Sequence, residues 1–160
     1  ADATYVAELV GNADGTELQV LINGRPVATG KVGDTLVVPV QTFKTQKIQV
    51  QPKDPDFVRF DEEPQMVTLY PGNVVRKTWE VERIILMFGR IINTQGQPIS
   101  WKQVQGLETA ALADKFGNVE MEFTGNEAPY IERDGGGCTL ALPPVDPDKS
   151  FEYVGDILCL

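Results

Sequence analysis

The chain holds 160 residues, with 23 acidic and 14 basic side chains and a formal net charge of −9. This charge repels phosphate backbones and anionic lipid headgroups, so we expect no nucleic-acid partner. No run approaches the ~20 apolar residues of a membrane-spanning helix, and no basic start followed by an apolar run marks a signal peptide. Because the chain begins at Ala1 rather than Met, we expect either a processed chain or, in preference, a piece of a longer protein whose targeting segment lies upstream.

Short β-branched runs separated by Gly and Pro fill the first half of the chain, where helix signals are nearly absent. The run 18–22 predicts a strand, and Asn23-Gly24 predicts a tight hairpin turn because such turns need positive φ. The run 36–40 is apolar on both faces, as in a sandwich-core strand, while its Pro39 predicts a sheet edge.

An extended segment over residues 74–92 links the two halves of the chain. Just before it, Pro71-Gly72 is the pairing that a type II turn requires. Near Glu82 solvated alternation gives way to an apolar run. We therefore predict two small domains, 1–82 and 83–160.

The second half shows the same punctuation by turns. Residues 109–113 predict a short strand in preference to a short helix, because the run is too short to be a stable helix alone. The turn at 113–118 and the alternating strand at 119–123 that follow have the pattern of a hairpin. Residues 135–137 predict a Gly-rich turn, followed by a strand at 138–142 and a last strand from Phe151 toward Cys159. The expected fold is all-β, with two small β-sandwich domains, Ig-like or transthyretin-like, in tandem.

Cys138 and Cys159 are the only cysteines and lie 21 positions apart. In a small domain of extracellular type, an even count is most simply a disulfide, which implies an oxidising compartment. Closing such a loop contributes about 3 kcal/mol on the chain-entropy model. The alternative is a pair of buried reduced thiols in a cytosolic protein.

The chain contains no histidine, which removes the usual general base and the commonest zinc ligand. We therefore predict no catalytic, cofactor-binding or metal-binding residue and no enzyme activity. One carboxylate cluster leaves calcium binding or glycosidase-like hydrolysis open, although its spacing matches no EF-hand and a solvated acidic loop is the simpler interpretation. The acids of this cluster are Asp54, Asp56, Asp61, Glu62 and Glu63.

The two tryptophans have two possible roles. Trp79 and Trp101 could be exposed platforms for carbohydrate stacking, but burial in the core is the expected role because an aromatic ring removes a large area from water.

Two sets of motifs resemble known families. The first set resembles carboxypeptidase-regulatory-like, transthyretin-type sandwiches, a pattern that names a fold and not a function. It consists of Gly89–Ile92, Gly96–Ile99 and Asp114–Gly117, with Phe123 beyond. The second set, with the terminal cysteine pair, resembles the C-terminal region of ushers of CS1-type, or alternate chaperone/usher, pilus systems. It runs from Leu69–Val75 through Trp79–Val81 into Phe88–Arg90.

The usher resemblance implies a location at the periplasmic face of the bacterial outer membrane, attached to a membrane barrel but not itself embedded. It implies as partners chaperone-pilin subunit complexes and other domains of the same usher. Handover of subunits exchanges β-strand pairings and needs no cofactor. The alternative function is a carbohydrate-binding or adhesin-type sandwich of a secreted or cell-surface protein.

Overall fold

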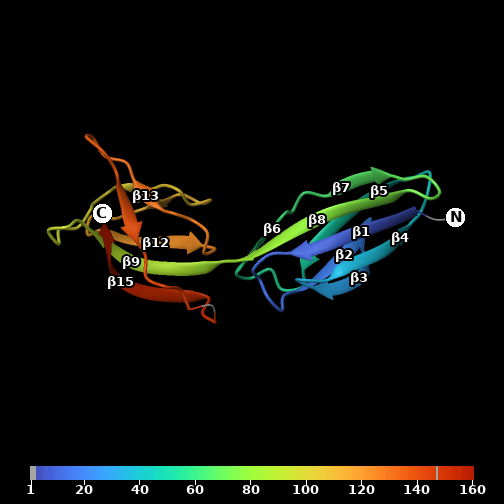
Figure 1. Ribbon diagram of the computed structural model, residues 1–160, viewed down its shortest axis with the longest axis horizontal. Helices are drawn as coiled ribbons and strands as arrows, with labels where there is room; N and C mark the ends of the chain where they lie inside the picture. Colours follow the sequence, from blue (N-terminus) through green and yellow to red (C-terminus); the bar gives the residue numbers. More distant parts are fainter. Residues whose placement is uncertain (1–2, 147) are drawn as a thin grey trace. The chain divides into compact units, whose positions relative to one another are not determined.

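A computed structural model of the chain describes residues 3–146 and 148–160. All secondary-structure elements in these residues are β-strands. The predicted all-β class is therefore confirmed. The chain divides into two compact units, Ala1–Arg83 and Ile84–Leu160 (Figure 1). We call them the amino-terminal unit and the carboxy-terminal unit. Ala1, on which the expectation of a longer parent protein rests, lies outside the described residues.

The amino-terminal unit is a sandwich of two four-stranded sheets (Figure 1). Its strands are β1 (Ala3–Val10), β2 (Glu17–Ile22), β3 (Arg25–Lys31), β4 (Thr35–Val40), β5 (Thr45–Pro52), β6 (Val58–Phe60), β7 (Gln65–Thr68) and β8 (Val74–Arg83). One sheet has the order β4-β1-β8-β6 and the other the order β3-β2-β5-β7. Strands β1 and β8 are parallel, whereas the other pairs are antiparallel.

Alternation of apolar and polar residues sends one face of each sheet into a shared core. Leu18 and Val20 of one sheet belong to the same buried cluster as Tyr5, Trp79 and Val81 of the other. Trp79 is only 2% exposed, so the expectation of core packing is confirmed for this tryptophan.

The predicted turns form as their sequences require. Asn23 and Gly24 have φ angles of 52° and 83° and join β2 to β3, as a hairpin turn with two positive φ values demands. Gly72 has φ 85°, and the Asn73 amide donates to the Tyr70 carbonyl over 2.9 Å. This is the geometry of the predicted type II turn.

Strand β4 lies at the edge of its sheet, as Pro39 predicted. The expectation that both of its faces are buried is wrong, because Val37 is 65% exposed whereas Val38 is 3% exposed. The apolar run 36–40 therefore reflects β-propensity at an edge and not double burial.

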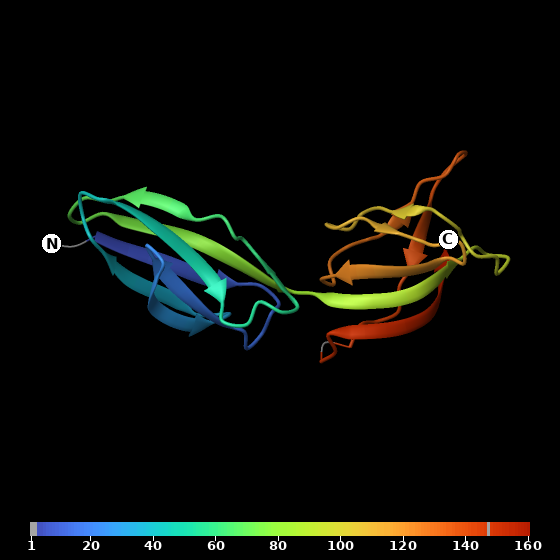
Figure 2. The same ribbon diagram turned by 180° about the vertical axis from the view of Figure 1, so that it is seen from behind.

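The carboxy-terminal unit is built on one five-stranded sheet with the order β12-β9-β15-β14-β13. Strands β10 and β11 form a separate two-stranded piece. The strands are β9 (Ile85–Ile92), β10 (Gln103–Val104), β11 (Ala111–Leu112), β12 (Asn118–Phe123), β13 (Tyr130–Ile131), β14 (Cys138–Ala141) and β15 (Phe151–Cys159). Both views of the ribbon show β9 between β12 and β15 (Figure 1 and Figure 2).

Strand β12 has the predicted alternation, with Val119, Met121 and Phe123 buried. The expected hairpin with the preceding segment is wrong, because β12 pairs with β9 and β11 pairs with β10. The turn before β12 runs close to β9, where a Cβ on Gly117 would lie 2.6 Å from the Ile91 carbonyl oxygen. The chain therefore enters the sheet beside β9.

Cys138 of β14 and Cys159 of β15 form the predicted disulfide. Both are buried, with exposures of 4% and 3%, and both belong to the core cluster of this unit. The bridge joins neighbouring antiparallel strands of the sheet, in which Leu140 is the register partner of Cys159. The last strand is thereby fixed to its neighbour.

Candidate functional site

Four apolar side chains that do not reach the core lie side by side on the outer face of the carboxy-terminal sheet, near the start of β9 and β15. Phe151 and Tyr153 of β15 are 64% and 75% exposed. Their register partners on the parallel strand β9 are Leu86 and Phe88, which are half-buried. We call these four residues the aromatic face.

A β-bulge in β15 makes this arrangement compatible with the core. Strict alternation after Phe151 and Tyr153 would turn Ile157 and Cys159 outward, since successive side chains point to opposite faces. The register instead shifts between Tyr153 and Gly155, and Gly155 adopts φ 70°. An inserted residue reverses the facing of the side chains that follow it. One strand therefore exposes its aromatic side chains and still buries its disulfide.

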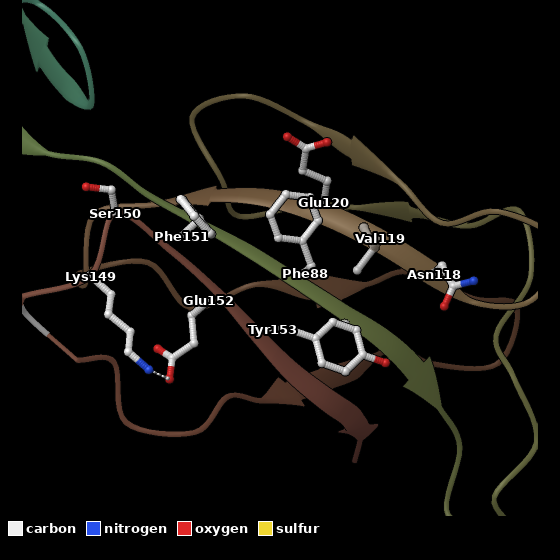
Figure 3. Close-up of a pocket in the computed structure, with 10 residues that line it drawn as sticks. Phe88, Asn118, Val119, Glu120, Lys149, Ser150, Phe151, Glu152 and Tyr153 are labelled. Atoms are coloured by element: carbon white, nitrogen blue, oxygen red, sulfur yellow. Dashed lines mark ion pairs between the residues drawn. The ribbon is translucent and has the colours of Figure 1, made fainter.

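The aromatic face borders an open groove of ≈ 1060 Å³ (Figure 3). Most of the exposed lining is apolar, and β12, β9 and β15 all contribute to it. The lining residues are Phe88, Gly89, Asn118, Val119, Glu120, Lys149, Ser150, Phe151, Glu152 and Tyr153.

The charges around the groove are mainly acidic. The two cations near it face carboxylates, Lys149 with Glu152 and Arg90 with Asp156, each with an N···O distance of 3.9 Å. Glu120 has no ion pair or hydrogen bond within 3–146 and 148–160. Residues 84–160 hold 11 acidic and five basic side chains, so this unit carries −6 of the net charge of −9.

Glu152 combines two unlike environments. One carboxylate oxygen faces Lys149 (Figure 3). The other, Oε2, is the single buried side-chain nitrogen or oxygen without a hydrogen-bond partner in the described part of the chain. Burying such an atom unpaired costs about 1–3 kcal/mol. The structure therefore places an unpaired carboxylate oxygen beside the groove.

The predicted acidic cluster does not assemble into a site. All five of its carboxylate residues are exposed, and Asp61 pairs with Lys77 at 3.4 Å. Asp54 accepts a hydrogen bond from the Asp56 backbone amide, which is the local bonding of a turn. The described residues contain no group of three or more His, Cys, Asp or Glu placed to hold a metal ion.

Trp101 contradicts the expectation of core packing. It is 64% exposed and has φ 59°. Its backbone amide donates to the Asp114 carbonyl over 3.2 Å, so the residue sits in a connection where its side chain turns away from the core. It does not line the groove beside the aromatic face.

The aromatic face was missed from the sequence. A signal was present, because Phe151 and Tyr153 alternate with Glu152 at the start of the last strand. That pattern is equally typical of a strand with its aromatic side chains in the core. The bulge between Tyr153 and Gly155 decides that these two aromatic side chains point away from the core, and no spacing in the sequence marks this bulge.

The fold and this surface define a two-unit, all-β chain with an exposed aromatic face. Residues 69–160 match the family described as CS1-pili formation C-terminal, and this match spans more than half of the chain. The chain belongs to that family, and the resemblance to the C-terminal region of CS1-type ushers is confirmed.

The same fold is seen in a chain of the cryo-EM structure of the E. coli P pilus tip assembly intermediate PapC-PapD-PapK-PapG, with a TM-score of 0.69 and 16% identity. That match covers 100% of the present chain and 20% of the other, so the present chain spans about a fifth of its length.

Two other matches have lower TM-scores. The Bacillus anthracis TIE protein gives 0.41, at 11% identity over 100% of the present chain and 34% of its own. Shaft pilin spaA from Lactobacillus rhamnosus GG, as the D295N mutant, gives 0.37 at 8% identity, over 99% and 98% of the two chains. None of the curated proteins compared with the chain matches it. No helix in the described ranges is long and apolar enough to cross a membrane.

Proposed function

We propose that this chain is a non-enzymatic, protein-binding part of an outer-membrane usher that receives chaperone-pilin subunit complexes during pilus assembly. It would act at the periplasmic face of the bacterial outer membrane. The observation that carries the proposal is the match of residues 69–160 to the CS1-pili formation C-terminal family. The fold shared with a chain of the P pilus assembly intermediate supports it.

The chemistry of the chain supports binding over catalysis. The sequence has no histidine, and its largest acidic cluster is divided between two hollows, with Asp54 and Asp56 lining one and Glu62 lining the other. The groove is lined by aromatic rings and a few polar side chains. Such surfaces recognise proteins through buried aromatic anchors surrounded by a polar rim.

A disulfide supports the proposed compartment. Cys138 and Cys159 are paired in the core, and such bonds persist in oxidising compartments, of which the bacterial periplasm is one. A subunit handover site there needs neither nucleotide nor metal, because pilin subunits exchange strand pairings.

The carbohydrate-binding alternative rests on Trp101, whose ring is exposed and available for stacking. A deep aromatic groove that contains Trp101 would favour this alternative. Trp101 does not line the groove described above, so the alternative has an exposed ring but no shaped site. Binding on a glycan array that disappears in Trp101→Ala would favour it over the usher proposal.

Titration calorimetry with a purified chaperone-pilin complex of a CS1-type system tests the proposal. We expect saturable binding by the 160-residue chain, and no binding by a chain of the same fold from an unrelated protein. The far-ultraviolet circular dichroism spectrum must show β-structure in the same sample. If a folded chain gives no detectable heat of binding with any such complex, the proposal is contradicted.

A further inference from the structure

The aromatic face and the acids beside it also indicate what kind of surface the partner presents. This inference rests on the proposed function. We propose that the aromatic face of the carboxy-terminal unit contacts the chaperone-pilin complex, and that it takes a patch of apolar side chains flanked by Lys or Arg.

The aromatic face is costly in a protein without a partner. Phe151 and Tyr153 are the more exposed pair of the four residues, at 64% and 75%. On the neighbouring strand, Leu86 is the register partner of Phe151 and Phe88 is the register partner of Tyr153. Contiguous exposed apolar patches on soluble proteins mark interaction sites. A partner that covers these rings removes a large apolar area from water.

The sheet presents these rings in a fixed direction. Phe88, Phe151 and Tyr153 lie on long strands and not in loops (Figure 3). The bulge at Tyr153 and Gly155 orients β15 so that both aromatic side chains face outward. Each ring has only two side-chain torsions, so little conformational entropy is lost when a partner orders it.

The polar rim determines the charge of the partner. Glu120 is the cross-strand register partner of Phe88, and Phe88 is in turn the partner of Tyr153, so these three residues form one row across the sheet. Within the described residues Glu120 faces no cation, whereas Lys149 and Arg90 are already paired with carboxylates. The acids therefore complement a basic surface, and complementary charge favours encounter and suppresses wrong partners.

The same charge disfavours a second copy of this chain as the occupant. A twofold contact would bring two aromatic faces together with their own acidic rims. The carboxy-terminal unit of each copy, residues 84–160, carries a net charge of −6, so the two copies would repel each other. A basic partner gains from the same charges.

The test compares one double variant with matched controls in the 160-residue chain. Phe151→Ser with Tyr153→Ser removes the rings at exposed positions, so the fold is retained. The control is Phe43→Ser, which changes an aromatic ring that is 69% exposed in the other unit. Glu120→Lys reverses the rim charge, and Glu63→Lys makes the same change at an exposed site of the amino-terminal unit.

Binding to the purified chaperone-pilin complex is measured by biolayer interferometry at low and high salt. We expect the double variant to bind roughly tenfold more weakly or worse, with Phe43→Ser unchanged. Glu120→Lys should slow association and weaken its salt dependence, whereas Glu63→Lys should not.

The outcomes separate the inference from the proposed function. If the unmodified chain binds the complex and the double variant binds equally well, the aromatic face is not the contact surface, although the proposed function stands. If the unmodified, folded chain does not bind at all, both fail. Light scattering that shows a dimer dissolved by the double substitution would overturn the inference in favour of self-association. Equal effects of Glu120→Lys and Glu63→Lys would overturn its charge component.

Discussion

The indole Nε1 of Trp79 donates a hydrogen bond to the phenol oxygen of Tyr5 over 3.1 Å inside the amino-terminal sandwich. Tyr5 in turn donates to Gln65 Oε1 over 2.6 Å. Trp79 and Tyr5 lie in one sheet and Gln65 in the other. The phenol therefore satisfies two polar groups at once and links the two layers.

Replacing Tyr5 by Phe removes this link. The buried Trp79 N–H loses its acceptor, and an unsatisfied buried donor costs about 1–3 kcal/mol. We expect the free energy of unfolding of the amino-terminal unit to fall by that amount, measured by urea denaturation followed by Trp79 fluorescence in a Trp101→Phe background. Tyr70→Phe is the control, because Tyr70 is 53% exposed. Equal stability of the two variants would contradict the role of the link.

Alkaline pH should weaken the same unit. Burial raises the pKa of Tyr5 above its ordinary value, although the hydrogen bond from Trp79 lowers it in part. The unfolded chain therefore loses the phenol proton first, near pH ~10, while the folded chain keeps it. Stability is complete below that pH and falls as the pH rises toward the folded pKa. Melting curves across this range should show a steeper loss for the unmodified chain than for Tyr5→Phe, and parallel curves would contradict the shift.

Loss of the disulfide should destabilise the carboxy-terminal unit alone. Cys138 and Cys159 close a loop of sequence separation 21, which contributes about 3 kcal/mol on the chain-entropy model. In the double variant Cys138→Ala, Cys159→Ala we expect the melting temperature of this unit to fall by several degrees. Calorimetry can follow both units, and the amino-terminal unit serves as the internal control. An unchanged melting temperature of the carboxy-terminal unit would show that the disulfide does not stabilise it.

Glu152→Met should stabilise the carboxy-terminal unit. The substitution removes the buried Oε2 that has no hydrogen-bond partner and keeps a side chain of similar length. The lost ion pair with Lys149 is long, at 3.9 Å, so it offsets little of the gain. We expect about 1 kcal/mol more stability by urea denaturation. Lys149→Met tests the ion pair alone, and a Glu152→Met protein that is less stable would show that the carboxylate is satisfied.

Gly155→Ala should test the bulge. Gly155 has φ 70°, and a Cβ there would meet no atom within 4 Å. The cost is therefore conformational, about 1–2 kcal/mol for a left-handed residue with a side chain. Asn tolerates this region better, so Gly155→Asn should cost less. Equal stability of all three proteins would show that the bulge does not need a left-handed residue.

The turn chemistry made much of the fold predictable. Asn23, Gly24 and Gly72 adopt the positive φ values that their turns require and that few other residues accept, and Pro71 supplies the negative φ before Gly72. Both turns form as expected. Alternation at residues 119–123 gave the buried face of β12. The partner of that strand was not predictable, because pairing depends on contacts between residues far apart in the chain.

Local pattern also failed where a residue's direction depended on its surroundings. Trp101 has a large hydrophobic side chain, as core residues do, yet the connection in which it lies turns this side chain outward. Val37 sits in an apolar run, yet its strand has an open outer face at the edge of a sheet. Hydrophobicity records the gain available from burial and not whether the fold provides a place for it.

The sequence by itself determined the class of the chain, its turns and its cysteine pair, because these depend on backbone preferences and on residues that have few alternatives. Tertiary structure alone decided that Phe151 and Tyr153 face outward while Ile157 and Cys159 face inward. A shift of one residue in strand register reverses every side chain that follows, and the bulge that produces it is selected by the packing of β15 against β9 and β14.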